Sequence, residues 1–225
     1  AEPDRSVNNN GLQVFGTVTK SPVATGADLV AYSGGATDRL VLPNSEGLNF
    51  GLGDFCISVW AKQTQQDLTI VYIGDGTSLY PENGMHFWLN GGYVKYNISS
   101  GLRQVLTPSG NTNWALYNFV RKDGIVHLYQ NGVLFDSLDR STSQVTSTED
   151  ASVLSGFYNN NPNNSMALLR ISGTAPTAEQ IKKIYEDEKV LFQENAQATL
   201  YGTDDAVTAL AYDDSTDLLH VGTSA

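Results

Sequence analysis

The chain has 225 residues, with 13 basic and 24 acidic side chains and a single cysteine. This length suits one large β-sandwich or barrel, or one domain with an appendage, and it supports a hydrophobic core without disulfides. The net charge of −11 argues against nucleic acid and anionic membranes as partners. Because no run of about 18 apolar residues occurs, we expect no membrane insertion. A single Cys56 excludes an internal disulfide and a cysteine-based zinc site.

The charge is unevenly distributed. Residues 1–176 hold 10 basic and 14 acidic side chains, a net charge of −4, whereas residues 177–225 hold 3 and 10, a net charge of −7. Only 16% of the residues are charged, against about 25% in typical domains, which favours an all-β surface or extracellular protein. The charge shift predicts an organisational boundary. We predict a leader over 1–27, a main domain over 28–176, a linking helix over 177–195 and an acidic tail over 196–225.

Short apolar runs separated by turns of glycine and asparagine fill the main domain. Residues 54–62 (DFCISVWAK) alternate, so that Phe55 and Ile57 point to one face of a strand and Trp60 to the other. Residues 13–18 form either a short strand or part of a loosely packed leader. Further strands are predicted over residues 28–32, 39–42, 68–73, 85–89, 93–98, 115–121, 125–130, 133–135, 152–158 and 167–171. Strands and helices do not alternate, so the pattern predicts an all-β antiparallel sandwich or barrel.

One helix and one hairpin follow the main domain. Thr177 and Gln180 form a capping-box pattern after Pro176, and an apolar stripe continues to about residue 194. We expect this stripe to dock on the sandwich, with a partner-binding face as the alternative. Residues 207–212 and 218–223 predict a hairpin. Since a lone hairpin is marginal in water, it must pack on the sandwich, pair between chains or belong to a larger unit.

Four segments occur in a fixed order at regular spacing. They are YSGG (32–35) with RLVLP (39–43), LNFG (48–51) with DFCISVWAK (54–62), NFVR (118–121) with VHLYQNG (126–132), and LRI (169–171) with PTAEQI (176–181) and Tyr185. Together they resemble the laminin-G-like, or concanavalin A-like, jelly-roll family. The resemblance implies two antiparallel sheets packed face to face. Such domains bind sugars or proteins, cleave glycans or act as spacers, so fold alone does not choose a function.

The tail resembles a hairpin of a β-propeller blade. A jelly roll, a linking helix and such a hairpin together resemble tail-fibre or other appendage proteins of bacteriophages, particularly marine ones. This resemblance implies a viral structural protein located in the virion or outside the cell. It also implies a homotrimer and a chain that is one piece of a longer polypeptide.

Catalytic patterns are missing from the sequence. Jelly-roll glucanases carry alternating acidic residues along one strand, and no predicted strand here has that pattern. His86, His127 and His220 lie on separate predicted strands, and Cys56 lies in an apolar pattern where a small buried residue is expected. We therefore expect a protein that is not an enzyme and has no cofactor.

Aromatic side chains are the candidates for carbohydrate binding. In residues 85–89, strand parity separates His86 and Trp88 from the more apolar Met85, Phe87 and Leu89, so the first pair is expected to line an outer, concave sheet. The alternative is that Trp88 and Trp60 pack under the helix or a long loop. The full set of ligand-binding candidates is His86, Trp88, Tyr93, Tyr96, Trp114 and Tyr158.

Calcium is the one metal that the sequence suggests. Asp75, Glu82 and Asn83 supply the oxygen ligands that calcium prefers. The favoured alternative is that they serve only as ordinary turn residues. As a whole, the sequence favours a recognition module of a phage or virion appendage that binds a host-surface glycan or protein. The alternatives are a structural or assembly module in contact with other virion proteins and, less favoured, a secreted glycan-active enzyme.

Overall fold

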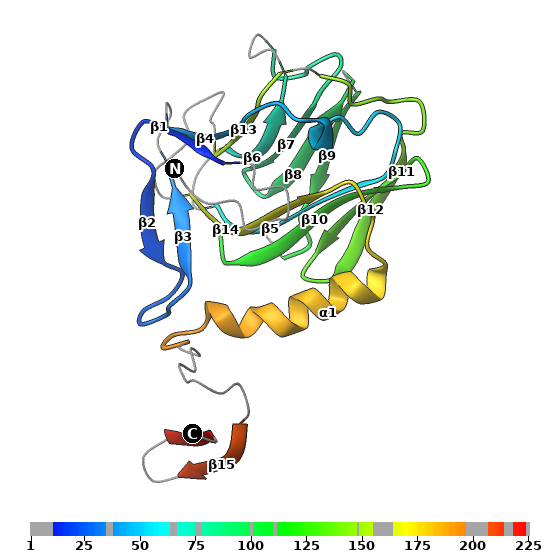
Figure 1. Ribbon diagram of the computed structural model, residues 1–225. Helices are drawn as coiled ribbons and strands as arrows, with labels where there is room; N and C mark the ends of the chain where they lie inside the picture. Colours follow the sequence, from blue (N-terminus) through cyan, green and yellow to red (C-terminus); the bar gives the residue numbers. More distant parts are fainter. Residues whose placement is uncertain are drawn as a thin grey trace.

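The structure, a computed structural model, describes residues 11–34, 38–63, 67–74, 78–99, 101–109, 112–147, 149–154, 164–196, 207–213 and 218–223. Two seven-stranded antiparallel sheets pack face to face, as predicted (Figure 1). Sheet I has the order β1 (Gln13–Phe15), β4 (Arg39–Leu42), β13 (Ala151–Val153), β6 (Leu68–Ile73), β7 (Met85–Asn90), β8 (Tyr93–Ile98) and β9 (Gly101–Leu106). Sheet II has the order β12 (Val133–Asp139), β11 (Ile125–Gln130), β10 (Ala115–Lys122), β5 (Phe55–Lys62), β14 (Ser165–Ser172), β3 (Val30–Ser33) and β2 (Thr19–Pro22).

Two strands were not expected from the sequence. Strand β2 pairs with β3, and strand β9 pairs with β8 at the free edge of sheet I. The short strand expected within residues 13–18 is present as β1, which pairs with β4. The strand predicted over 152–158 is described only as β13, because residues 155–163 lie outside the described part of the chain.

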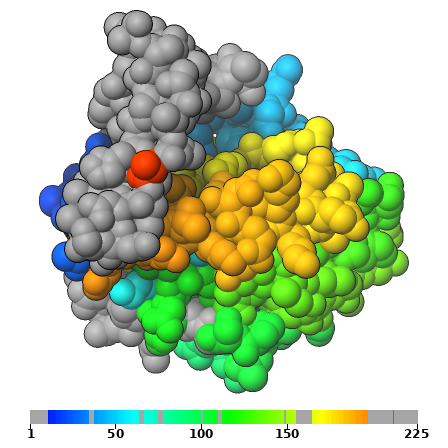
Figure 2. Space-filling model, turned by 90° about the horizontal axis from the view of Figure 1, so that it is seen from below, coloured from blue at the N-terminus to red at the C-terminus, as the bar shows by residue number. Residues whose placement is uncertain are grey.

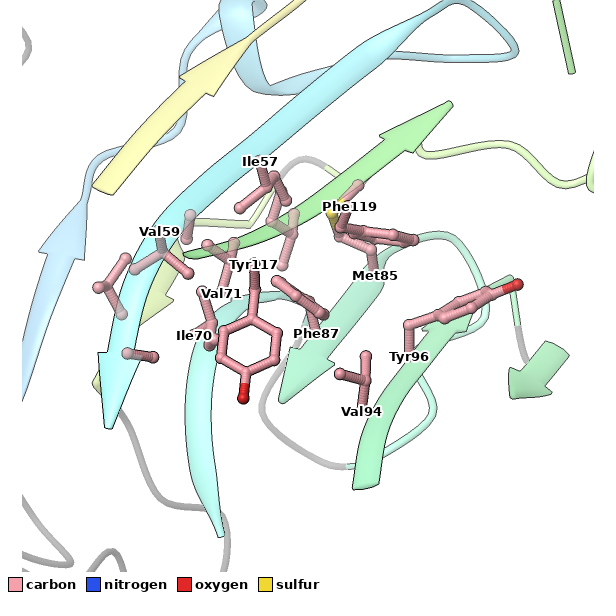
Figure 3. Packing of buried hydrophobic residues seen from close by; sticks show 14 of the residues in the cluster. Ile57, Val59, Ile70, Val71, Met85, Phe87, Val94, Tyr96, Tyr117 and Phe119 are labelled. Atoms are coloured by element: carbon pink, nitrogen blue, oxygen red, sulfur yellow. The ribbon is translucent and has the colours of Figure 1, made fainter. Parts of the chain in front are cut away.

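The hydrophobic core lies between the two sheets. The predicted alternation along β5 is confirmed, since Phe55, Ile57 and Val59 all belong to the core between the sheets, whereas Cys56 and Trp60 belong to clusters on the other face. Figure 3 shows Ile57 and Val59 pointing inward. Phe119 of β10 stacks on Phe87 of β7 with ring centroids 5.0 Å apart, so the two sheets meet through aromatic side chains. Packing of this kind fixes which face of each strand is turned to the outside.

Arg121 is a fully buried cation at one end of this core. Its guanidinium donates hydrogen bonds to the carbonyl oxygens of Gly51, Gly53 and Ser143 at 2.6–2.7 Å, and it lies 5.0 Å from the ring of Phe55. A buried guanidinium without partners is costly, and here its three hydrogen bonds join the segments around Gly51, Gly53 and Ser143 to β10. Residues 46–48 add a short 3₁₀ turn, η1 (Glu46–Leu48), before this region.

The predicted helix is present as α1 (Ala178–Glu188) and continues as the 3₁₀ turn η2 (Lys189–Phe192). Its capping box is confirmed: Gln180 N–H donates to Thr177 Oγ1 at 3.3 Å, and Thr177 N–H donates to Gln180 Oε1 at 2.8 Å. The α-helix therefore ends six residues before the expected position near residue 194. Figure 2 shows the helix lying across the outside of the sandwich.

The helix docks on sheet II, as expected. Ile181 is buried against a cluster that includes Cys56, and Trp60 of β5 stacks on Phe192 with centroids 4.2 Å apart. The turn between β11 and β12 comes close to the helix at Gly132, where a Cβ atom would lie 3.0 Å from Cα of Lys182. Gly132 also has a φ of +78°, so glycine is required there both by conformation and by space.

The tail forms the expected hairpin. Strands β15 (Val207–Asp213) and β16 (Leu218–Thr223) pair antiparallel as a separate two-stranded sheet. Among the helices of the described residues, none is both long enough and apolar enough to cross a membrane.

Candidate functional site

The outer faces of the two sheets differ in what covers them. The outer face of sheet II carries α1 and η2, which bury Trp60 and Leu116. The outer face of sheet I is covered over β6 and β7 by residues 78–84, and it is exposed over β9. Among β6 to β9, the part of the outer face that a large ligand can reach therefore lies over β8 and β9, within the described part of the chain.

The covered half of sheet I is held by specific contacts. Tyr72 donates its hydroxyl hydrogen to the Ser78 carbonyl at 2.8 Å, and His86 contacts the Leu79 carbonyl at 3.2 Å. Tyr80 lies over Trp88 with ring centroids 6.4 Å apart. Trp88 is consequently only 5% exposed, and it stacks on His86 at 4.0 Å.

These contacts correct the expectation for His86 and Trp88. Both side chains do lie on the outer face, as strand parity predicts, but both are buried and neither offers an exposed platform. The reason is the fold of residues 78–84, which the strand pattern does not encode. The alternative interpretation is confirmed instead, because Trp88 packs under a loop segment and Trp60 under the helix.

His86 is held neutral by its surroundings. A carbonyl oxygen can only accept a hydrogen bond, so Nδ1 carries the proton that is donated to Leu79 O. Nε2 then accepts from the Thr69 hydroxyl at 3.1 Å. Burial lowers the pKa of His86 to about 3, and the bond to Leu79 offsets only part of this effect. The imidazole thus acts as a fixed polar bridge between β6, β7 and the covering segment.

The register of β7, β8 and β9 arranges the outer face of sheet I as three rows of side chains. Directly paired residues on adjacent strands lie on the same face. The rows are Asn90, Tyr93 and Leu106; Trp88, Lys95 and Gln104; and His86, Asn97 and Leu102.

Exposure rises across these rows from β7 to β9. Leu106 is 65% exposed and Leu102 46% exposed, Gln104 is also exposed, and Tyr93 and Lys95 are partly exposed. We call the surface formed by Tyr93, Lys95, Leu102, Gln104 and Leu106 the open face. It combines an aromatic ring, an ammonium group, an amide and two apolar side chains. This mixture can bind a ligand that has both apolar and hydroxyl-rich surfaces.

A group of amides borders the open face at the end of β7. The amide of Asn90 donates to the Asp67 carboxylate, and the amide of Asn164 donates to the Asp67 carbonyl at 3.3 Å. Gln63 donates to the Leu89 carbonyl at 2.9 Å. These contacts hold the end of β7 in place beside Tyr93.

The sequence interpretation missed Lys95, Gln104 and Asp67. The signal for Lys95 was present, because Lys95 and Tyr93 share one parity on β8 and the Asn90-Gly91-Gly92 turn fixes their register with β7. Gln104 required β9, which was not predicted. No local pattern points to Asp67.

The other candidate residues are distributed over the molecule. Tyr96 points into the core and packs on Phe119 at 4.9 Å, which corrects its assignment as a surface residue. Burial raises the pKa of Tyr96, and the nearby Arg140 offsets part of that rise.

Trp114 has a structural role, since its indole N–H donates to the Val23 carbonyl at 2.8 Å and its ring packs on Phe192. Tyr158 lies outside the described residues.

The calcium prediction is not tested by this arrangement. Glu82 and Asn83 are exposed, the Asn83 carbonyl accepts a hydrogen bond from Thr146 N–H at 2.8 Å, and Asp75 lies outside the described residues. Within the described ranges, no three His, Cys, Asp or Glu side chains are grouped closely enough to hold a metal.

Burial raises the pKa of Cys56 to about 12, so its thiol stays protonated at neutral pH.

Comparison with solved structures finds the same architecture in receptor-binding domains. The receptor-binding domain of botulinum neurotoxin C/D mosaic serotype is 17% identical, with a TM-score of 0.65 over 84% of this chain and 49% of its own. The binding domain of Paraclostridial Mosquitocidal Protein 1 is 18% identical, with a TM-score of 0.66 over 82% of this chain and 49% of its own.

A third similar structure contains a sugar. It is the ligand-binding domain of botulinum neurotoxin serotype D in complex with N-acetylneuraminic acid, 18% identical, with a TM-score of 0.64 over 84% of this chain and 48% of its own. The chain thus spans about half the length of these structures, and the likeness establishes a shared fold.

Two sequence comparisons complete the assignment. No curated protein matches the chain. Residues 33–182 match the family described as the Concanavalin A-like lectin/glucanases superfamily. This match covers more than half of the chain and agrees with the two-sheet sandwich. It includes, wholly or in part, each of the four segments that resemble the family. The chain therefore belongs to the Concanavalin A-like lectin/glucanases superfamily.

Proposed function

We propose that the protein is a non-enzymatic binding module that recognises carbohydrate on a cell surface through its open face. The observation that carries this proposal is the difference between the two outer faces. The helix covers sheet II, whereas the outer face of sheet I presents the partly exposed Tyr93 and Lys95 of β8 beside the exposed Leu102, Gln104 and Leu106 of β9. An aromatic ring flanked by hydrogen-bonding side chains suits a sugar, which has one apolar C–H face and many hydroxyl groups.

The similar structures support the same proposal. Two of them are described as receptor-binding or binding domains, and a third was solved with N-acetylneuraminic acid. Jelly-roll glucanases carry their catalytic carboxylates on alternate residues of one strand. Among the described residues of this chain, no strand of sheet I has such a pair of carboxylates. Binding is therefore favoured over glycan cleavage.

A glycan array with the purified chain tests the proposal. Tyr93→Ala is expected to reduce the affinity for the preferred glycan at least tenfold. This is the size of effect expected when the stacking contact between a sugar and an aromatic ring is lost and the ligand is no longer aligned with the neighbouring side chains. Phe15→Ala is the matched control, because Phe15 is a 41% exposed aromatic residue on β1 at the opposite edge of sheet I. If no glycan binds, or if both variants bind like the original chain, the proposed function is wrong.

The biological setting that we propose is a phage or virion appendage outside the cell. It is supported by the sequence order of a jelly roll, a docked helix and a separate hairpin, which is modular. Mass spectrometry of purified particles should detect the chain as a stoichiometric component. Its absence from the particles, with the chain found free in the medium, would contradict this setting.

A structural or assembly role is the second candidate. It is favoured by the β15–β16 hairpin, because a two-stranded sheet gains stability when it pairs with further strands. Analytical ultracentrifugation should then show a homotrimer. A stable trimer that binds no glycan would favour the assembly role over the binding role.

A further inference from the structure

We infer that the ligand of the open face is an acidic saccharide whose carboxylate binds Lys95. This inference deepens the proposed function and rests on it. Lys95 occupies the centre of the three rows on sheet I, with Trp88 directly opposite on β7 and Gln104 directly opposite on β9. Any ligand that lies flat across β8 and β9 meets this ammonium group.

Lys95 is not neutralised by a carboxylate of the described residues. Arg103, Arg170 and Lys183 each pair with a carboxylate. Among the described residues, no carboxylate lies within ion-pair distance of Lys95. The centre of the open face therefore carries one positive charge that the described side chains leave available to a ligand.

The surroundings of Lys95 favour the binding of an anion. Its side chain is partly exposed and is paired in register with Trp88, whose indole is buried. A ligand carboxylate that reaches the open face can form a charge-assisted hydrogen bond with this ammonium group.

The remaining side chains of the open face narrow the ligand class to sugars with an apolar substituent. Tyr93 lies two residues from Lys95 on the same face of β8 and offers a ring for a sugar C–H face. Gln104 offers an amide to hydroxyl or N-acyl groups. Leu102 and Leu106 offer apolar contact, which suits the methyl group of an N-acetyl substituent.

A site with one lysine suits a ligand carboxylate better than a ligand phosphate or sulfate group. Phosphate sites typically combine several donors or the planar fork of arginine. Arg103 lies on the opposite face of β9, and its Nε and Nη2 both donate to the Asp136 carboxylate. The open face therefore offers a single positive charge, which matches a single carboxylate.

Titration calorimetry with two probes tests the inference. The first probe is an oligosaccharide that ends in N-acetylneuraminic acid, and the second is the same oligosaccharide after removal of that sugar. We expect the acidic probe to bind more tightly than the neutral one. Lys95→Gln should lower the affinity for the acidic probe by about tenfold, the effect of losing one charge-assisted hydrogen bond. Raising the salt concentration from about 0.05 M to about 0.5 M should also lower the affinity for the acidic probe.

Lys182→Gln is the matched control. It removes the same charge from an exposed position on α1, on the opposite side of the sandwich, and it should leave both affinities unchanged. Lys95→Gln should lose much less affinity for the neutral probe than for the acidic probe, because only the acidic probe loses its partner for the ligand carboxylate. An unchanged thermal unfolding midpoint of Lys95→Gln shows that the variant is folded.

The possible results separate the inference from the proposed function. Equal affinities for the two probes, or an acidic probe that is insensitive to Lys95→Gln, would overturn the carboxylate assignment and leave carbohydrate binding intact. Preference for a sulfated neutral sugar over the carboxylate probe would overturn it as well. Failure to bind any saccharide would instead overturn the proposed function.

Discussion

The indole N–H of Trp60 on β5 donates a 2.7 Å hydrogen bond to a carboxylate oxygen of Glu188, in the last turn of α1. The second carboxylate oxygen pairs with Arg170 of β14, and the Glu188 side chain is only 14% exposed. One carboxylate thus ties the helix to two neighbouring strands of sheet II. This contact holds the helix over the outer face of sheet II.

Glu188→Ala should destabilise the protein through this contact. The substitution leaves a buried indole N–H without its partner and removes the anion beside Arg170, so we expect the free energy of unfolding to fall by about 1–3 kcal/mol. Urea denaturation followed by tryptophan fluorescence measures the change. Glu186→Ala is the control on the same helix, because Glu186 makes only an exposed pair with Lys189, and its loss should change stability little. Equal effects of the two variants would contradict the anchoring role of Glu188.

Arg121→Met should have a larger effect on stability. The methionine fills much of the space but leaves the carbonyl groups of Gly51, Gly53 and Ser143 without their shared donor. We expect a loss of about 3 kcal/mol or more in the free energy of unfolding. Arg39→Met, at the edge strand β4, removes only the contact with Phe15 and should cost less than about 1 kcal/mol. A neutral Arg121→Met variant would show that these loops are held by other contacts.

His86 makes stability depend on pH. An unfolded histidine takes up a proton below its ordinary pKa of 6.5, whereas burial keeps folded His86 neutral down to a pKa of about 3. Between these values the unfolded state binds more protons, so stability is full above pH 6.5 and falls as the pH falls. From about pH 7.5 to about pH 5 the loss should be about 2 kcal/mol.

Two histidine variants distinguish the source of this slope. His86→Gln should flatten the fall in stability between these two pH values. His127→Gln should change this fall in stability less. The pKa of His127 is also lowered, by partial burial and by the nearby Lys122, but His127 is partly exposed and lies outside the core. If His86→Gln does not fold, an NMR titration of the original chain gives the His86 pKa directly, and a value near 6.5 would contradict the prediction.

Strand parity explains how much of the site could be predicted. Parity placed Met85, Phe87 and Leu89 inside and His86 and Trp88 outside, and this assignment is confirmed. The same rule separates Tyr93 from Tyr96, which stand three residues apart and therefore face opposite sides of β8. What parity cannot supply is the cover over an outer face, because the fold of residues 78–84 depends on contacts such as Tyr72 with Ser78.

The free edge of sheet I was missed for a related reason. In β9 the apolar Leu102 and Leu106 face solvent, while the inner side carries Arg103 and Val105. A strand with reversed polarity looks like a loop when only its sequence is read. The fold class, in contrast, depends on many inner strands with regular turns, so a few such exceptions do not change it.

Trp88→Ala and Tyr93→Ala should separate stability from binding. Trp88 is 5% exposed and packs between His86 and Tyr80, so its truncation should lower the free energy of unfolding by about 3–5 kcal/mol. Tyr93 lies partly exposed on the open face, and its truncation should cost less than about 1.5 kcal/mol while binding is lost. Thermal unfolding and glycan titration of both variants give the two quantities. A Trp88→Ala variant of unchanged stability would mean that Trp88 is not covered in solution, and the recognition surface would then extend over β7.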